Sequence, residues 1–363
     1  MKIRKAILTG GGRGTRLHPV TTTINKHLLP LANKPMIFHA IEKAVEAGVT
    51  NIYINLNPGD TELPRYIGDG GHWGISIDYF EQRGGPQGIA HVVKEAEEFI
   101  GNDPFMFYLS DNVLLGSLAE MVEEFHKNKY DCMLALSQVE DARQFGVPVF
   151  NDNNELVDVW EKPSSPPNNF AVTGIYLYGP KVFFESYNNI EKSARGEYEI
   201  SSVHSDFIKR GLKVGHKEIT GWWKDTGKPH DLLVASRLLL DGMAEKEFPK
   251  QGAVAPDARI EGKVHIGVGS QIREGVTIIG PVIIAENCVL ERCTIGPHVT
   301  LGAGATVKRA TIRHSIVLDN ALVDAPMTII DSLIGKKAEL IKRDDDRPEG
   351  HRMVIGDKTV IEM

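Results

Sequence analysis

Short apolar runs alternate with stretches of helical periodicity up to about residue 240. Residues 5–8, "KAIL", predict a first strand, and further apolar runs at 51–56, 75–80 and 104–109 predict others. Between them, residues 35–48 place apolar side chains on one helical face and end at a glycine, which predicts a helix with one buried side. This alternation favours an α/β domain with a Rossmann-like, mostly parallel sheet.

The pattern changes completely beyond Pro249 and Gly252, which mark a predicted boundary between domains 1–248 and 249–363. From there, aliphatic residues recur at every sixth position, slip once by one residue, and resume. These positions are Val254, Ile260, Ile266, Ile272, Ile278, Ile284, Leu290, and then Ile295, Leu301 and Val307. A period of six resembles the left-handed parallel β-helix of hexapeptide-repeat proteins, in which each coil buries its aliphatic side chain on the coil beneath. Because such flanks and an uncapped last coil invite subunit contact, we expect a homo-oligomer.

Composition and charge narrow the class of protein. With 363 residues the chain is long enough for about two domains. Lys and Arg total 41 against 48 Asp and Glu, a net charge of −7, which argues against nonspecific binding to nucleic acid or an anionic membrane. No apolar run reaches the roughly 20 residues that span a bilayer, and glycines follow "MKIRKAIL" too soon for a signal peptide, so we expect a cytoplasmic protein. Cys132, Cys288 and Cys293 form no disulfide or zinc pattern and are predicted to be buried thiols.

A glycine-rich basic loop, "GGGRGTRLHPVTTTINKHLLPLANKP", follows the first strand at residues 10–35. Glycines allow a sharp turn and direct backbone N–H groups at an anion, which suits phosphate binding. The loop is not a Walker A motif, because Gly14 is followed by Thr15 and Arg16 instead of Lys-Ser or Lys-Thr. It is not a dinucleotide fingerprint either, because Leu17 stands where the third glycine belongs.

The loop instead resembles, almost without interruption over residues 11–36, the signature of sugar-phosphate nucleotidylyltransferases. The resemblance extends over essentially the whole first domain. It is carried by the segments "YLSDNVLLG", "QFGVPVF", "VWEKP", "NFAVTGIYLY", "RGEYEIS" and "WWKDTGKPHDLLVAS". Within the family, the likeness is greatest to the long-form enzymes that join dTTP to glucose 1-phosphate, since a β-helix follows the catalytic domain.

The resemblance implies roles for residues on the nucleotide side. Arg16 and Lys26 would neutralise the departing pyrophosphate, and Asp111 and Asp225 would share Mg²⁺, for which carboxylate oxygens are suitable ligands. The positions implied to bind the triphosphate are Gly11, Gly12, Gly14 and Thr15. The partners are therefore a nucleoside triphosphate and a sugar 1-phosphate.

The same resemblance implies a sugar side and a base side. Lys162, aided by Arg195, would hold the attacking phosphate, while Glu161 would accept hydrogen bonds from sugar hydroxyls. Gln82 would pair with a pyrimidine edge, and Gly88 would let the backbone approach the base. The remaining positions of the implied sugar pocket are Gly146, Val172 and Thr173.

Three alternatives stay open on the sequence. A uridylyltransferase shares most of these motifs, and His27 stands where thymidylyltransferases usually have Gln. A non-catalytic regulatory or scaffold homologue is the second alternative, although the charged positions are all kept. The third is an acyltransferase activity of the β-helix, for which His265, His298 or His314 would be the candidate base.

Overall fold

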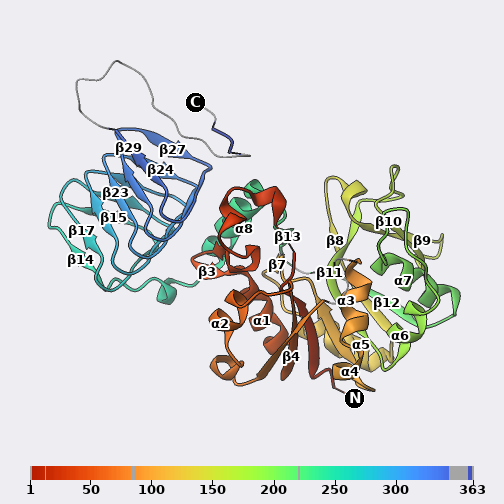
Figure 1. Ribbon diagram of the computed structural model, residues 1–363. Coiled ribbons are helices and arrows are strands. Elements are labelled where there is room, and N and C mark those ends of the chain that lie inside the picture. The colour runs from red at the N-terminus through yellow and green to blue at the C-terminus, as the bar shows by residue number, and fades with distance from the viewer. Residues whose placement is uncertain are drawn as a thin grey trace. The chain divides into compact units, whose positions relative to one another are not determined.

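The computed structural model describes residues 2–12, 14–82, 85, 87–219, 221–342 and 359–361 (Figure 1). The chain divides into two compact units. The first comprises Met1–Gly12 and Ile37–Asp225, and the second comprises Arg13–Met36 and Thr226–Met363. The domain boundary after residue 248 stays a prediction.

The centre of the first unit is a parallel array of four strands in the order β6-β1-β4-β5. These strands are β1 (Lys5–Thr9), β4 (Asn51–Leu56), β5 (Ser76–Glu81) and β6 (Phe105–Tyr108). β6 is buried at every position. Consecutive buried residues, without alternation, are typical of a strand covered on both faces. The strands predicted at 5–8, 51–56, 75–80 and 104–109 are confirmed, with ends shifted by at most one residue.

Beyond β6 the sheet continues through antiparallel pairs, because β11 runs opposite to β6. β11 also pairs with β8 and β9, β9 with β10, and β12 runs parallel to β8. The bounds of these strands are β8 Cys132–Gln138, β9 Gly146–Phe150, β10 Leu156–Glu161, β11 Phe170–Tyr178 and β12 Val214–Glu218. The parallel half places loops at its carboxyl edge, and the antiparallel half extends the same sheet sideways.

Helices α3, α6 and α7 pack on one face of this sheet and enclose an aromatic core that includes Phe105, Tyr178 and Phe207. The predicted helix at 35–48 is observed as α1. The helices are α1 Met36–Glu46, α2 Glu62–Ile67, α3 Ile89–Glu95, α4 Glu97–Ile100, α5 Ala119–Asn128, α6 Val182–Tyr187, α7 Ile200–Lys209 and α8 Pro229–Gly242. Short 3₁₀ turns add Gly71–Trp73, Ala142–Gln144 and Glu245–Glu247.

In the second unit, the basic loop forms three short 3₁₀ turns and a two-stranded hairpin that contacts α8. The backbone N–H of Ala32 donates to Ser236 Oγ at 3.1 Å. The elements are η1 Thr15–Leu17, η2 Val20–Thr22, η3 Lys26–Leu28, β2 Pro30–Leu31 and β3 Lys34–Pro35. This packing gives a loop rich in glycine and threonine a defined backbone.

The rest of the second unit is a parallel β-helix of three sheets, as predicted (Figure 1). The first sheet contains β14 Ala253–Val254, β17 Gln271–Ile272, β20 Val289–Glu291, β23 Thr306–Lys308, β26 Leu322–Asp324 and β29 Glu339–Ile341. The second contains β15 Arg259–Glu261, β18 Thr277–Ile279, β21 Thr294–Ile295, β24 Thr311–Arg313 and β27 Thr328–Ile330. The third contains β16 Val264–Ile266, β19 Val282–Ile284, β22 Val299–Leu301, β25 Ile316–Val317 and β28 Leu333–Ile334.

The one-residue slip in the hexapeptide period shortens a coil. Gln271 pairs with Val289, eighteen residues later, but Thr277 pairs with Thr294, only seventeen residues later. Cys293 therefore takes the inward position. The aliphatic positions from 266 to 307 are buried as expected, whereas Val254, on the first coil, is 42% exposed.

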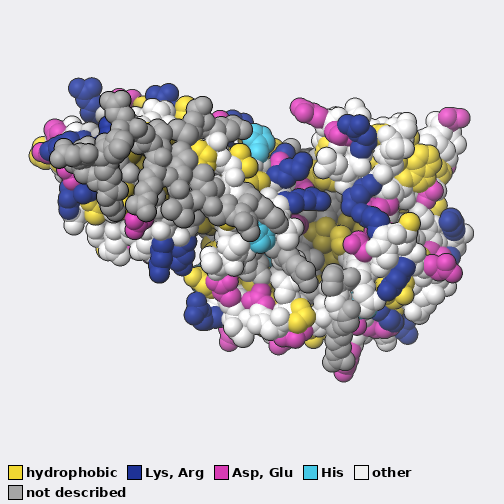
Figure 2. Space-filling view, turned by 45° about the horizontal axis from the view of Figure 1, so that its top comes forward, with side chains coloured by type: hydrophobic (Ala, Val, Ile, Leu, Met, Phe, Trp, Pro, Cys, Tyr) yellow, Lys and Arg dark blue, Asp and Glu magenta, His cyan; other side chains and the backbone are white. Residues whose placement is uncertain are grey.

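All three cysteines are free and buried, which confirms the prediction. In the described part of the chain, none of the helices has the length and apolar character needed to cross a membrane. Lys and Arg side chains are interspersed with Asp and Glu over the face seen in Figure 2, in keeping with the small negative net charge.

Candidate active site

The residues of the first unit that are predicted to bind the nucleoside triphosphate and its metal lie at the carboxyl edge of the parallel strands. The backbone N–H of Ser110, after β6, donates to Thr9 Oγ1, at the end of β1, at 2.9 Å. The glycines that follow β1 and the Ser110–Asp111 turn therefore emerge side by side. Ligands of open α/β sheets bind at this edge.

Two asparagines that the sequence did not reveal hold the start of the glycine loop: Asn55, near the end of β4, and Asn57, just after it. Gly11 N–H donates to Asn55 Oδ1 at 3.3 Å, and Gly12 N–H donates to Asn57 Oδ1 at 2.8 Å. A Cβ atom at Gly10 would lie 2.7 Å from the Asn55 carbonyl oxygen, so this approach requires glycine. The N–H groups of Gly11 and Gly12, which are expected to bind triphosphate, therefore already donate to asparagine oxygens. A phosphate oxygen would have to replace these acceptors.

The two acids implied in metal binding are brought to neighbouring positions by a short ladder. β7 (Asn112–Leu114) pairs antiparallel with β13 (Trp223–Asp225), so that Asp225 lies opposite Asn112, the residue next to Asp111. The ladder is fixed from the side, because Trp223 Nε1 donates to Asn112 Oδ1 at 2.9 Å.

The local surroundings suit a hard divalent cation. Asn112 Nδ2 donates to Asp111 Oδ1 at 3.1 Å and orients that carboxylate. Burial, together with the negative charge of Asp111, raises the pKa of Tyr108. Among the described residues there is no cluster of three or more His, Cys, Asp or Glu that could hold a metal ion. Two carboxylates, with substrate phosphates completing the coordination, match the way Mg²⁺ is usually bound.

Arg16 and Lys26, which are predicted to neutralise pyrophosphate, lie in the second unit, in the turns that follow Gly14. Gly14 has a φ of 55°, and a Cβ there would lie 3.1 Å from Lys26 Cβ. Thr21 Oγ1 donates to the Gly14 carbonyl at 2.8 Å. Thr15 and Arg16 are exposed on the first 3₁₀ turn, and Lys26 is half-buried on the third. Within this unit the loop thus brings Gly14 and Lys26 together and leaves the Arg16 side chain accessible.

The predicted sugar residues lie on adjacent strands of the antiparallel half. Gly146 is the register partner of both Glu161 and Val172. A Cβ at Gly146 would lie 3.8 Å from Glu161 Oε2, so its absence leaves room in front of the carboxylate. Thr173 is buried, and its hydroxyl donates to the Ala135 carbonyl at 2.9 Å, which leaves only its backbone for a ligand.

Glu161 and Arg195 are locked in a network that the motifs did not predict. Glu161 accepts from Ser201 Oγ at 2.9 Å and from Arg195 Nη2 at 3.2 Å. Lys162 Nζ lies 3.5 Å from Glu161 Oε1, and Lys162 itself has a φ of 46°. Arg195 also donates to Glu199 at 2.8 Å, and Glu199 is only 7% exposed. The basic groups predicted to bind phosphate are therefore paired, in this structure, with the carboxylate predicted to accept from sugar hydroxyls.

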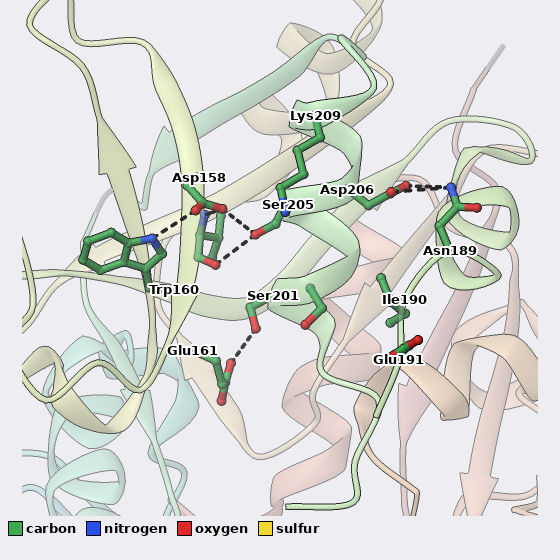
Figure 3. Close-up of a pocket in the computed structure, with 12 residues that line it drawn as sticks. Asp158, Trp160, Glu161, Asn189, Ile190, Glu191, Ser201, Ser205, Asp206 and Lys209 are labelled. Atoms are coloured by element: carbon green, nitrogen blue, oxygen red, sulfur yellow. Dashed lines mark hydrogen bonds between the residues drawn. The ribbon is translucent and has the colours of Figure 1, made fainter. Parts of the chain in front are cut away.

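A polar groove of about 470 Å³ runs from Glu161 along β10 and α7 (Figure 3). Ser205 Oγ donates to Asp158 Oδ1 at 2.5 Å, and Trp160 Nε1 donates to Asp158 Oδ2 at 3.0 Å. Ser201 and Ser205 both project from α7, one turn apart, toward β10 (Figure 3). The groove is thus a continuation of the Glu161 site whose walls are joined by hydrogen bonds.

Gln82 and Gly88 are predicted to bind the nucleobase. The segment around Gly88 contacts Tyr198, which lies three residues after Arg195. Gly88 has a φ of 98°, and a Cβ there would lie 2.5 Å from the Tyr198 carbonyl oxygen. Tyr198 N–H donates to the Gln87 carbonyl at 2.8 Å. Gln82, just after β5, lies 3.4 Å from His91 Nδ1.

The histidines considered for acyl transfer lie on the β-helix. His298 Nε2 is 2.8 Å from Asp241 Oδ1 of α8, and its ring stacks on that of His314 at 5.2 Å. His265 lies within β16. The Asp241 contact gives His298 a structural role in joining α8 to the β-helix.

Comparison with known proteins identifies the family of this chain. Residues 5–242 match the family model for nucleotidyl transferases. The chain belongs to the nucleotidyl transferase family. It is 37% identical to the low-salt glycan biosynthesis nucleotidyltransferase of Haloferax volcanii over 99% of this chain and 100% of that protein.

Other family members are similar to this chain over its full length or over about two thirds of its structure. The glucose-1-phosphate thymidylyltransferase of Streptomyces antibioticus is 33% identical over 99% of both chains. A solved UDP-glucose pyrophosphorylase, in complex with UDP-glucose, superposes with a TM-score of 0.59 at 26% identity, covering 66% of this chain and 100% of that one. Sugar-phosphate nucleotidyltransferase activity is therefore supported for this family member.

Proposed function

We propose that this enzyme joins dTTP and glucose 1-phosphate to give dTDP-glucose and pyrophosphate in a Mg²⁺-dependent reaction. The observation that carries the proposal is the β7–β13 ladder, which brings Asp111 and Asp225 to neighbouring positions in the first unit. The likeness to the thymidylyltransferase of Streptomyces antibioticus over the full chain supports the choice of nucleotide and sugar.

The chemistry demands positioning and charge neutralisation more than proton transfer. A sugar phosphate has a second pKa near ~6, so it arrives ionised and its oxygen can attack the α-phosphorus directly. The bond from that phosphorus to the bridging oxygen breaks, and pyrophosphate leaves. Mg²⁺ held by Asp111 and Asp225 would reduce the negative charge of the reacting phosphates.

The chain's own side chains would hold the two polyanions. Gly11, Gly12 and the Gly14–Thr15 turn bind the triphosphate, and Arg16 and Lys26 neutralise the pyrophosphate as it leaves.

On the sugar side, an incoming phosphate competes with Glu161 for Lys162 and Arg195. Glu161 is then free to accept hydrogen bonds from the sugar, while Glu199 keeps the Arg195 side chain in place. Binding of the sugar phosphate is thus an exchange of ion partners.

Initial rates of pyrophosphate release test the proposal. The purified full chain would be assayed with MgCl₂, glucose 1-phosphate and either dTTP or UTP. We expect dTTP to be preferred. A preference for UTP of about tenfold or more would replace the thymidylyl assignment with a uridylyl one, which the likeness to a UDP-glucose pyrophosphorylase favours. Absence of pyrophosphate release across sugar phosphates would instead favour a non-catalytic homologue.

We further propose that residues 249–363 are a separate β-helical domain that serves in homo-oligomer formation. The flat flanks of a β-helix favour association between copies. Light scattering of the intact protein would give a mass of two or more chains, and a monomer would contradict this role.

A further inference from the structure

A line of four polar side chains crosses the base side of the first unit, from Lys192 through Gln87 and His91 to Gln82. Lys192 Nζ lies 3.0 Å from Gln87 Oε1. The other end of the Gln87 amide lies 3.4 Å from His91 Nε2, and His91 Nδ1 lies 3.4 Å from the amide of Gln82. The His91 ring is stacked on Tyr198, with centroids 6.2 Å apart. These contacts hold the imidazole between two amides.

The donor and acceptor roles along this line follow from its first member. A lysine ammonium can only donate, so the Gln87 atom facing it must be the carbonyl oxygen. The Gln87 NH₂ group therefore faces His91 Nε2, which must accept. An imidazole whose Nε2 accepts cannot be the doubly protonated cation, so the ring is neutral. In keeping with this, burial lowers the pKa of His91, an effect that the charge of Glu95 opposes and the charge of Lys192 supports.

A neutral imidazole with an accepting Nε2 carries its proton on Nδ1. Nδ1–H then requires an acceptor, which is the carbonyl oxygen of Gln82. The amide orientation that places Gln82 Nε2 toward Nδ1 would set two donors against each other, and amide orientation is assigned from the hydrogen-bond network. The Gln82 amide consequently lies with Oε1 toward His91 and Nε2 away from it.

We propose that His91 is a specificity-determining residue that fixes the orientation of the Gln82 amide and thereby selects a uracil-type base over cytosine. The inference rests on the proposed function, in which Gln82 reads the base. Uracil and thymine present a carbonyl oxygen beside N3–H, which match an amide NH₂ and an amide oxygen with a spare lone pair. Cytosine presents an N4 donor in place of that O4 acceptor, so it requires the amide turned by 180°.

The protonation of the ring is tested directly by NMR. In protein labelled with ¹⁵N-histidine, two-bond ¹H–¹⁵N correlations distinguish the two neutral tautomers, and comparison with His91→Leu assigns the resonance. We expect the proton on Nδ1. Glu95 Oε1 lies 3.8 Å from Nε2, and a proton on Nε2 would mean that this carboxylate controls the ring, which overturns the proposal. This result does not depend on whether the protein turns over any substrate.

The selectivity is tested by binding. Calorimetric titration with MgdTTP and with MgdCTP, without sugar phosphate, gives the ratio of the two Kd values. We expect His91→Leu to reduce the preference for dTTP by about tenfold, the value of one neutral hydrogen bond. Gln87→Glu, which draws the proton to Nε2 and turns the Gln82 amide over, should reduce it as well.

The matched control is His126→Leu, another half-buried histidine, on α5. It should leave the ratio unchanged. An unchanged ratio in both His91→Leu and Gln87→Glu would overturn the proposal. Failure of the unaltered protein to bind either nucleotide would count against the proposed function instead, and the tautomer measurement would then decide the role of His91.

Discussion

His204 makes the stability of the first unit depend on pH. This histidine lies on α7 and is 0% exposed, with its Nε2 2.8 Å from the Tyr178 hydroxyl. Its Nδ1 has no hydrogen-bond partner among the described residues. Burial lowers the pKa of His204 to about 3. The folded unit therefore excludes a proton that the unfolded chain accepts near pH ~6.5.

The sign and size of the effect follow from this difference. The folded-state pKa is depressed, so the stabilisation is complete above the unfolded pKa and is lost as the pH falls below it. The loss is about 1.4 kcal/mol per pH unit between roughly pH 6.5 and pH 3. At about pH 5 the first unit should therefore be about 2 kcal/mol less stable than at neutral pH on account of His204 alone.

Urea unfolding followed by tryptophan fluorescence measures this loss. The chain has four tryptophans, Trp73, Trp160, Trp222 and Trp223, and all four lie in the first unit, so the signal reports that unit. The comparison is between the unaltered protein and His204→Phe, at pH 7.5 and at pH 5. Carboxylates contribute equally to both proteins, so the difference between their pH dependences isolates His204.

His204→Phe should lose about 2 kcal/mol less than the unaltered protein between the two pH values. Equal losses would refute the argument, because they would show that His204 takes up its proton without unfolding. The result bears on function, since α7 also carries Ser201, which holds Glu161.

Three further predictions concern Asp111 next to the β7–β13 ladder, Gly88, and the β-helix. Asp111→Asn should lower kcat at least about a hundredfold by removing one of two anionic metal ligands, with no change in the unfolding midpoint, and an unaltered kcat would show that the metal lies elsewhere. Gly88→Ala should destabilise the first unit by about 1–3 kcal/mol in urea unfolding, because its φ is 98° and its Cβ would meet a backbone carbonyl at 2.5 Å. The control is Gly68→Ala, at a φ of 73° with no atom within 4 Å of the added Cβ, and an equal cost in both variants would mean that the close contact is irrelevant. Leu290→Ala should cost the β-helix about 2–5 kcal/mol, as measured by thermal unfolding, since Leu290 is fully buried, and a cost near zero would show that the coils repack.

The fold was largely predictable because its periodicities are long and regular. The parallel strand β6 reads as an unbroken apolar run, and the hexapeptide period persists over many coils. The one-residue slip was visible in the sequence, but its result, Cys293 turning inward, depends on how the shortened coil stacks on its neighbours. The antiparallel half of the sheet was less evident, since its direction is set by how β11 adds to β6 and not by any local pattern.

The sequence predicted the charged residues of the candidate site but not the residues that hold them. Asp111 and Asp225 were predicted from motifs, and in the structure Asp225 pairs with Asn112, the residue next to Asp111. Asn55 and Asn57 were missed, because an asparagine at or just beyond the end of a strand is common. Glu199 was missed for a different reason: its contact with Arg195 becomes significant only once Glu161 is seen to share the same guanidinium.

The β7–β13 ladder also has a consequence for how the protein matures. Its two strands are separated in sequence by more than a hundred residues, which include strands β8 to β12, so their pairing is a long-range contact that is slow to form. If Asp111 and Asp225 hold Mg²⁺ as proposed, a chain that has not yet formed this pairing would not present the two carboxylates together.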